Sequence, residues 1–101
     1  MTVEAQRARS TAELQHSYLE ALGAELIRHG MGSILHAPVG RVPSLHVVNP
    51  AARALAENVF AACGRDGAWW FWWSWAERIT AADDPEGAAA CVARVLAAPH
   101  G

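Results

Sequence analysis

One stretch of the chain, Ala68 to Trp75, contains all five tryptophans of the protein and no charged residue. It is far shorter than the roughly 20 apolar residues that a membrane-spanning helix requires. It follows directly on Asp66-Gly67, a residue pair typical of tight hairpin turns. The stretch therefore predicts a strand, about Ala68 to Ile79, that pairs with the strand before the turn.

The side chains of a strand alternate between its two faces, so the aromatic residues divide into two sets. The larger set consists of Trp69, Phe71, Trp73 and Trp75, followed by Ile79. The smaller set consists of Trp70 and Trp72. Because the larger set offers more apolar area, we expect it to face the core and the smaller set to lie on the opposite, open face.

Two amphipathic helices flank the predicted strands. Ser10-Thr11-Ala12-Glu13 has the form of a capping box, and leucines then recur at helical spacing up to Gly30, a suitable C-terminal cap. These signals predict a first helix over about Thr11 to His29. Asp84-Pro85-Glu86 predicts the start of a second helix. Its expected apolar face consists of Ala88, Cys91, Val92, Val95 and Leu96.

Three further strands are expected between the helices, over Ser33–Ala37, Leu45–Asn49 and Asn58–Cys63. The segment Ala51–Glu57 is compatible with either a helical turn or a strand. Short turns between the strands favour an antiparallel meander, with both helices on one face of it. The prediction is a two-layer α+β sandwich of order αββββα. A flexible N-terminal arm (1–9), a single domain (10–98) and a tail (99–101) complete the organisation.

Composition limits the partners. The net charge is −2, the isoelectric point is near 6.2, and the eight basic residues include no lysine. Binding to nucleic acid or to an anionic membrane is therefore not expected. Cys63 and Cys91 show no disulfide or CxxC pattern, and no leader sequence opens the chain. We therefore expect a cytoplasmic protein.

The residues that could carry chemistry form no familiar set. His36 and His46 lie in neighbouring predicted strands and could join Cys63 as three metal ligands, but their spacing matches no zinc signature. No serine stands in a nucleophile-elbow context. The sequence thus predicts no catalytic, cofactor-binding or metal-binding residue and favours a protein that is not an enzyme. An enzyme would need a pocket with His36 or His46 beside a carboxylate.

An interaction surface is the favoured hypothesis. Burying one indole removes ~150–250 Å² from water, worth about 4–6 kcal/mol before entropic losses. Two neighbouring exposed indoles, Trp70 and Trp72, would form a patch that a soluble monomer seldom tolerates. We expect an accessory or regulatory module that covers this patch with a second copy of itself, as a homodimer, or with another protein. Arg41 and Arg65, in predicted turns, are candidate partner contacts.

Two alternatives stay open at this point. A loop or the N-terminal arm could cover Trp70 and Trp72, which would make them ordinary core residues. Alternatively, a small apolar ligand could bind between the tryptophan-rich strand and the first helix.

Two segments, Gly40 to Pro50 and Trp70 to Ile79, resemble a group of small actinobacterial proteins. That group shares a helix, a segment with Pro, Leu, Val and Asn, a tryptophan-rich strand and a final helix. The resemblance implies a bacterial cytoplasmic protein that forms one domain, and it transfers no site residue because the group has no assigned activity. The order of elements is also loosely similar to chaperone-type dimers of bacterial secretion systems.

Overall fold

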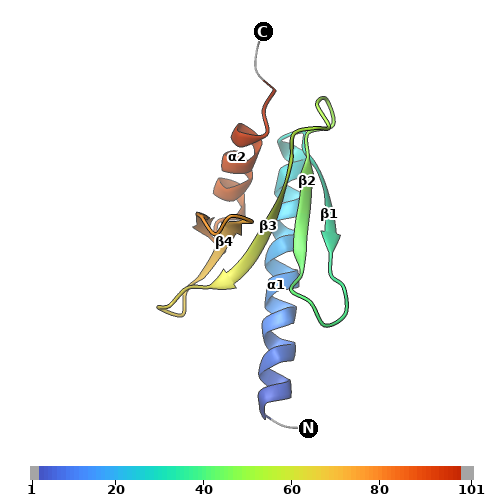
Figure 1. Ribbon diagram of the computed structural model, residues 1–101. Helices are drawn as coiled ribbons and strands as arrows, with labels where there is room; N and C mark the ends of the chain where they lie inside the picture. Colours follow the sequence, from blue (N-terminus) through green and yellow to red (C-terminus); the bar gives the residue numbers. More distant parts are fainter. Residues whose placement is uncertain (1–2, 99–101) are drawn as a thin grey trace.

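The computed structural model describes residues 3–98 and shows a five-stranded antiparallel sheet with two helices on one face. The elements are α1 (Val3–Arg28), β1 (Gly32–His36), β2 (Ser44–Val48), β3 (Ala56–Cys63), β4 (Trp69–Trp73), β5 (Arg78–Ala81) and α2 (Pro85–Val95). Spatial order follows chain order, β1-β2-β3-β4-β5 (Figure 1). The predicted α+β class and antiparallel meander are confirmed, whereas the predicted number of four strands is one too few.

The fifth strand arises because the chain turns back directly after Trp73. The Trp73 N–H donates to the Glu77 carbonyl (2.8 Å), and the Ala76 N–H donates to the Trp73 carbonyl (3.0 Å). Ala76 adopts a left-handed conformation, φ 65°. The predicted single strand from Ala68 to Ile79 is therefore wrong. Its turn contains no glycine, proline or asparagine, so no residue pattern marked it.

Helix α1 begins earlier and ends where expected. It starts at Val3, so Ser10 lies inside it, and the predicted capping box and start at Thr11 are wrong. The residues before Ser10 are mostly good helix formers, with no glycine or proline to stop the helix. Residues 3–9, assigned to a flexible arm, are thus helical, while residues 1–2 and the tail 99–101 lie outside the described residues. At the other end, Gly30 has φ 75°, and the Met31 N–H donates to the Leu26 carbonyl, so the predicted glycine cap is confirmed.

The segment after β2 combines both predicted possibilities. The residues that follow Asn49 form a hydrogen-bonded turn, which closes where the Asn49 N–H donates to the Leu55 carbonyl (3.0 Å). Ala56 and Glu57 then begin β3. The segment Ala51–Glu57 is therefore a turn followed by strand.

Helix α2 begins as the sequence predicts. The Asp84 carboxylate accepts a hydrogen bond from the Gly87 N–H (3.0 Å), and Pro85 takes the first helical position. The predicted apolar face is only partly correct, because Val95 is 52% exposed and Cys91 is half-buried. Val95 is the last residue of this short helix.

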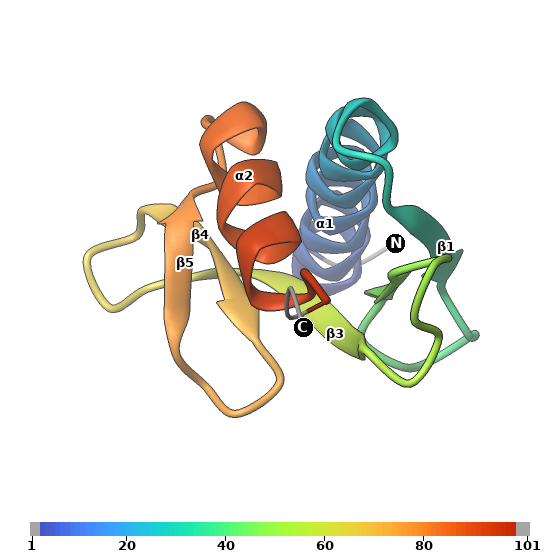
Figure 2. The ribbon, with the colours of Figure 1, turned by 90° about the horizontal axis from the view of Figure 1, so that it is seen from above.

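The core lies between the sheet and the helices, and Figure 2 shows the sheet curving round both of them. The buried residues include Leu19, Leu22 and Leu26 from α1, Leu45 and Val47 from β2, Val59 and Ala61 from β3, Phe71 and Trp73 from β4, and Ala88 and Val92 from α2. On α1, the Tyr18 ring packs at 5.5 Å from Trp69 and edge-on at 6.5 Å from Phe71. Within residues 3–98, no helix combines the length and the apolar character that crossing a membrane requires.

Candidate functional site

The aromatic strand divides between two faces largely as predicted. Phe71 is fully buried, Trp73 is 6% exposed, and both belong to the core with the half-buried Trp69. Trp75 is the exception, since it is 50% exposed. Its predicted place in the core is wrong because the chain leaves the strand after Trp73, so alternation no longer governs where its side chain points.

Trp70 and Trp72 lie on the open face of the sheet, the face turned away from the helices. Both are half-buried, and on the neighbouring strand Phe60 is paired with Trp72. Arg78 of β5 is paired with Trp72 on the other side. These four residues form what we call the aromatic patch: Phe60, Trp70, Trp72 and Arg78.

The Arg78 guanidinium lies over both indoles. Its central carbon is 4.6 Å from the centroid of the Trp70 ring and 5.3 Å from that of Trp72. The Nη2 atom extends to the β3–β4 loop, 3.4 Å from where a Cβ atom on Gly64 would stand. Asp66 Oδ1 is 3.1 Å from the same point, so this loop carboxylate lies near the guanidinium, although the two are not among the ion pairs of the described side chains. Such cation–π contacts hold the guanidinium over the rings. Its N–H groups are then presented at the edge of the patch.

The two indole N–H groups differ in their partners. The Trp72 Nε1–H donates to the Ala62 carbonyl (3.1 Å). The Trp70 Nε1–H is buried and finds no acceptor among the described residues. A buried donor left without a partner is unfavourable by about 1–3 kcal/mol. The aromatic patch is therefore not optimised for the stability of the isolated chain.

Arg78 has no carboxylate partner among the described side chains, where the ion pairs are His16–Glu20 and Arg28–Glu25. The strand residues that the register places on the open face also include no aspartate or glutamate. They are Gly32, Ile34, His36, Ser44, His46, Val48, Ala56, Asn58, Phe60, Ala62, Trp70, Trp72, Arg78 and Ala81. Within the described chain, the strands of the open face thus carry the positive charge of Arg78 and no formal negative charge.

The other two predicted contacts lie in loops and not on the strands that carry the patch. Arg41 is exposed in the β1–β2 loop, and Arg65 is exposed in the β3–β4 loop. Figure 1 places both loops at the lower end of the sheet, one below β1 and β2 and the other beyond β3 and β4. The structure therefore brings Trp70 and Trp72 together, but it does not join Arg41 to them.

Sequence reasoning missed Arg78 as a candidate site residue. In one continuous strand it would follow Trp72 along the chain by six residues. The turn after Trp73 instead returns it to the side of Trp72. No signal in the sequence marked that turn, so no signal could place this guanidinium over the indoles.

A second feature of the open face is a hollow of about 360 Å³, lined by Ile34, His36, Ser44, His46 and Asn58. The His46 Nδ1 and Asn58 Oδ1 atoms are 3.0 Å apart. Cys63 is not part of it, because it lies five residues beyond Asn58 on β3, about 16 Å away along the strand. The considered three-ligand set is therefore not assembled, and residues 3–98 hold no cluster of three or more His, Cys, Asp or Glu side chains placed to bind a metal ion.

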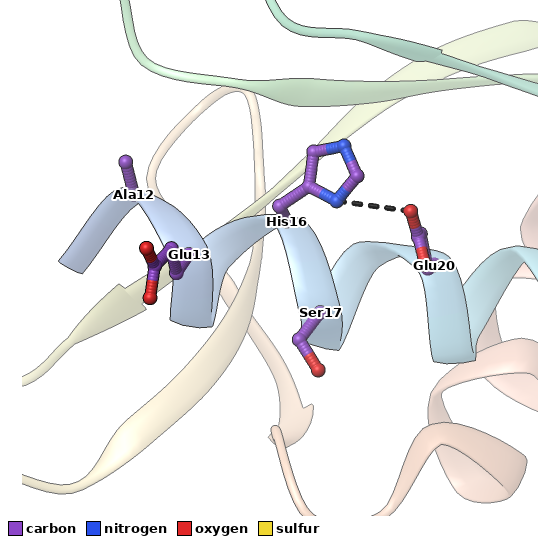
Figure 3. A pocket seen from close by; sticks show the side chains of 5 residues that line it. All are labelled: Ala12, Glu13, His16, Ser17 and Glu20. Atoms are coloured by element: carbon purple, nitrogen blue, oxygen red, sulfur yellow. Dashed lines mark ion pairs between the residues drawn. The ribbon is translucent and has the colours of Figure 1, made fainter. Parts of the chain in front are cut away.

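Another hollow, of about 380 Å³, lies along α1 and is lined by Ala12, Glu13, His16, Ser17 and Glu20. Figure 3 shows the His16 Nδ1 atom facing Glu20 Oε1, at 2.9 Å. All five lining residues come from a single helix and are exposed. This hollow is an open stretch of helix surface with an (i, i+4) ion pair and has no opposing wall to enclose a ligand.

Comparison of the chain with family models, curated proteins and solved structures finds no match. The function must therefore be argued from the residues of the open face themselves.

Proposed function

We propose that the protein is a non-enzymatic interaction module with an accessory role towards another protein, which it binds through the aromatic patch. The observation that supports this most is the Arg78 guanidinium stacked on Trp70 and Trp72 with no carboxylate partner among the described side chains. Tryptophan and arginine are, with tyrosine, the residue types enriched among the energetically dominant positions of protein interfaces. Here they are adjacent on the one face of the sheet that no helix covers.

The charge of the face indicates the kind of partner. The Arg78 guanidinium lies over two aromatic rings, and the N–H fork of a guanidinium matches a carboxylate bidentately. The surrounding strand residues offer apolar area from Phe60 and Ile34, the latter 68% exposed. The partner that fits is a protein segment in which aspartate or glutamate alternates with apolar side chains.

Two features make a second copy of this chain a poorer fit than an acidic partner. The open face is the outer, convex side of the curved sheet (Figure 2), so two copies meeting there would touch over a reduced area. A second copy would also bring another Arg78 and no strand carboxylate to pair with the first. The homodimer expected from the sequence stays a prediction, and the experiment below distinguishes it.

The other two functional readings find less support in the structure. An apolar ligand between the tryptophan-rich strand and α1 would need the space where Tyr18 packs on Trp69 and Phe71. An enzyme would need a carboxylate beside His36 or His46, and the group found beside His46 is the amide of Asn58.

Site-specific photo-crosslinking in the producing cells tests the proposal. A crosslinker replaces Ala62, beside Trp70 on the open face, and in a matched control it replaces Ala24, an exposed position on α1. We expect a discrete product from position 62 only, joined to an acidic and apolar segment of another protein. The product should disappear with Arg78→Glu and weaken with Arg78→Lys, which keeps the charge but not the planar fork.

The opposite results are equally clear. Identical products from positions 62 and 24, or a product that survives Arg78→Glu in a folded variant, would refute the aromatic patch as the binding site. A product between two copies, with a dimeric mass by light scattering that Trp70→Ser and Trp72→Ser abolish, would establish the homodimer instead.

A further inference from the structure

The hollow between β1, β2 and β3 contains a histidine whose tautomer is defined by its neighbour. The Asn58 Oδ1 atom can only accept a hydrogen bond, so the His46 Nδ1 atom, 3.0 Å away, carries the proton. In the neutral imidazole the lone pair then resides on Nε2. This is the arrangement of metal-binding histidines, whose second ring nitrogen donates to an oxygen that orients the ring.

A second imidazole shares the same face. His46 is paired with Ile34 and His36 is paired with Ser44, so the two histidines are diagonal neighbours on adjacent strands. Diagonal neighbours are separated by about 7–8 Å, within the reach of long side chains. Both histidines line the hollow of about 360 Å³. Two nitrogen ligands, each about 2.0–2.1 Å from a common ion, can be accommodated across this separation.

The shape of the hollow favours an ion over an organic ligand. Pockets for small molecules bury about 70–90% of the ligand surface, whereas Ile34, His36, His46 and Asn58 are all exposed. An ion needs only a few directed lone pairs. Imidazole nitrogen suits zinc, copper and nickel rather than magnesium or calcium.

We propose that His36 and His46 bind one divalent transition-metal ion, with Asn58 as a positioning residue that orients His46. Two protein ligands leave coordination positions open to water or to a group from a bound partner. This distinguishes the site from a closed, four-ligand structural zinc site. The proposal stands independently of the aromatic patch, because none of its residues belongs to that patch.

Titration of the metal-free full-length chain with ZnCl₂, followed by calorimetry and by NMR of the histidine rings, tests the site. We expect one ion per chain and shifted resonances from His36 and His46. His36→Ala and His46→Ala should each lower the affinity at least tenfold. Asn58→Ala should weaken zinc binding by about 10–100-fold, the usual effect of losing an orienting partner. Asn58→Asp keeps an oxygen acceptor and should therefore bind zinc at least as tightly as the unaltered chain.

The matched control is His16→Ala, because His16 and Glu20 on α1 are the pair of side chains that could compete as zinc ligands. This variant should bind zinc as the unaltered chain does. Failure of the unaltered chain to bind, or loss of binding in His16→Ala rather than in His36→Ala and His46→Ala, would overturn the site. Unchanged affinity in Asn58→Ala would refute the positioning role.

Discussion

Trp73 and Trp75 are stacked face to face, with ring centroids 4.9 Å apart and planes 6° from parallel, yet they occupy different environments. Trp73 is 6% exposed, whereas Trp75 is 50% exposed and donates its Nε1–H to Glu77 Oε2 (2.7 Å). Trp73 is therefore a core residue, whereas Trp75, two positions later, is a half-exposed residue of the β4–β5 turn.

The first prediction compares alanine substitutions at these two positions. Trp73→Ala should lower the free energy of unfolding by roughly 3–5 kcal/mol, because it opens a large cavity in the core. Trp75→Ala should cost only about 0.5–1.5 kcal/mol, the contribution of an aromatic pair. Urea unfolding followed by far-ultraviolet circular dichroism measures both. Equal losses would mean that Trp75 is buried in solution, by another chain for example.

The second prediction concerns the two indoles of the aromatic patch. Trp70→Phe and Trp72→Phe remove the same atoms, so their cavity terms are closely matched. Trp72→Phe also breaks the bond to the Ala62 carbonyl, whereas Trp70→Phe removes a buried donor that has no acceptor among the described residues. Trp70→Phe should therefore be less destabilising by about 1 kcal/mol or more. The opposite order in urea unfolding would show that the Trp70 N–H has a partner in solution.

At the scale of elements, the turn between β4 and β5 determines both the strand count and the make-up of the aromatic patch. Its left-handed residue, Ala76 (φ 65°), is the one non-glycine residue with positive φ in the described chain. A side chain in that conformation costs about 1–2 kcal/mol, which is why glycine usually occupies such positions. Sequence reasoning therefore had no residue to mark the turn and extended one strand through it.

The third prediction is that Ala76→Gly leaves the protein equally stable or stabilises it by up to about 1 kcal/mol. Relief of the left-handed strain outweighs the extra backbone entropy of glycine in the unfolded chain, about 0.5–1 kcal/mol. Ala68→Gly is the control, because Ala68 is also exposed beside a turn but does not have positive φ. Thermal unfolding of both variants measures the effect, and Ala68→Gly should be slightly destabilising. A larger loss of stability at position 76 than at position 68 would contradict the proposal that Ala76 is strained.

At the scale of the whole molecule, one buried side chain connects the two halves of the fold. The Asn49 Nδ2 atom donates to the Leu96 carbonyl at the end of α2 (2.8 Å), and its Oδ1 atom accepts from the Ala51 N–H (2.9 Å). Asn49 continues the alternation of Leu45 and Val47, so its side chain points to the same face as those two core residues. There its amide group binds the C-terminal end of α2. It is 7% exposed.

The fourth prediction is that Asn49→Asp destabilises the fold by about 1–3 kcal/mol at neutral pH. The carboxylate still accepts from Ala51, but it cannot donate to Leu96 and leaves that carbonyl without its bond. Asn58→Asp makes the same chemical change at an exposed site and should stay within about 0.5 kcal/mol. Equal effects at the two positions in urea unfolding would contradict the role given to Asn49.

Three boundaries of this fold follow from local signals in the sequence. Gly30 ends α1, Asp66-Gly67 joins β3 to β4, and Asp84-Pro85 begins α2. Alternation correctly assigned Phe71 and Trp73 to the core and left Trp70 and Trp72 on the open face. Each of these signals acts within a few residues, where propensity, capping and side-chain direction decide the structure.

The tertiary structure alone decided which distant residues meet. It placed Arg78 over Trp70 and Trp72, and it set Asn58 against His46. Both contacts depend on the register of strands joined by turns, and register is determined by the length and geometry of the turn together with the packing of the whole sheet. Because Ala76 carries no turn signal, the residues of the aromatic patch could be named from the sequence only in part. The strand that contains its two indoles was predicted from the Asp66-Gly67 turn before it, and alternation then placed the two indoles on one face.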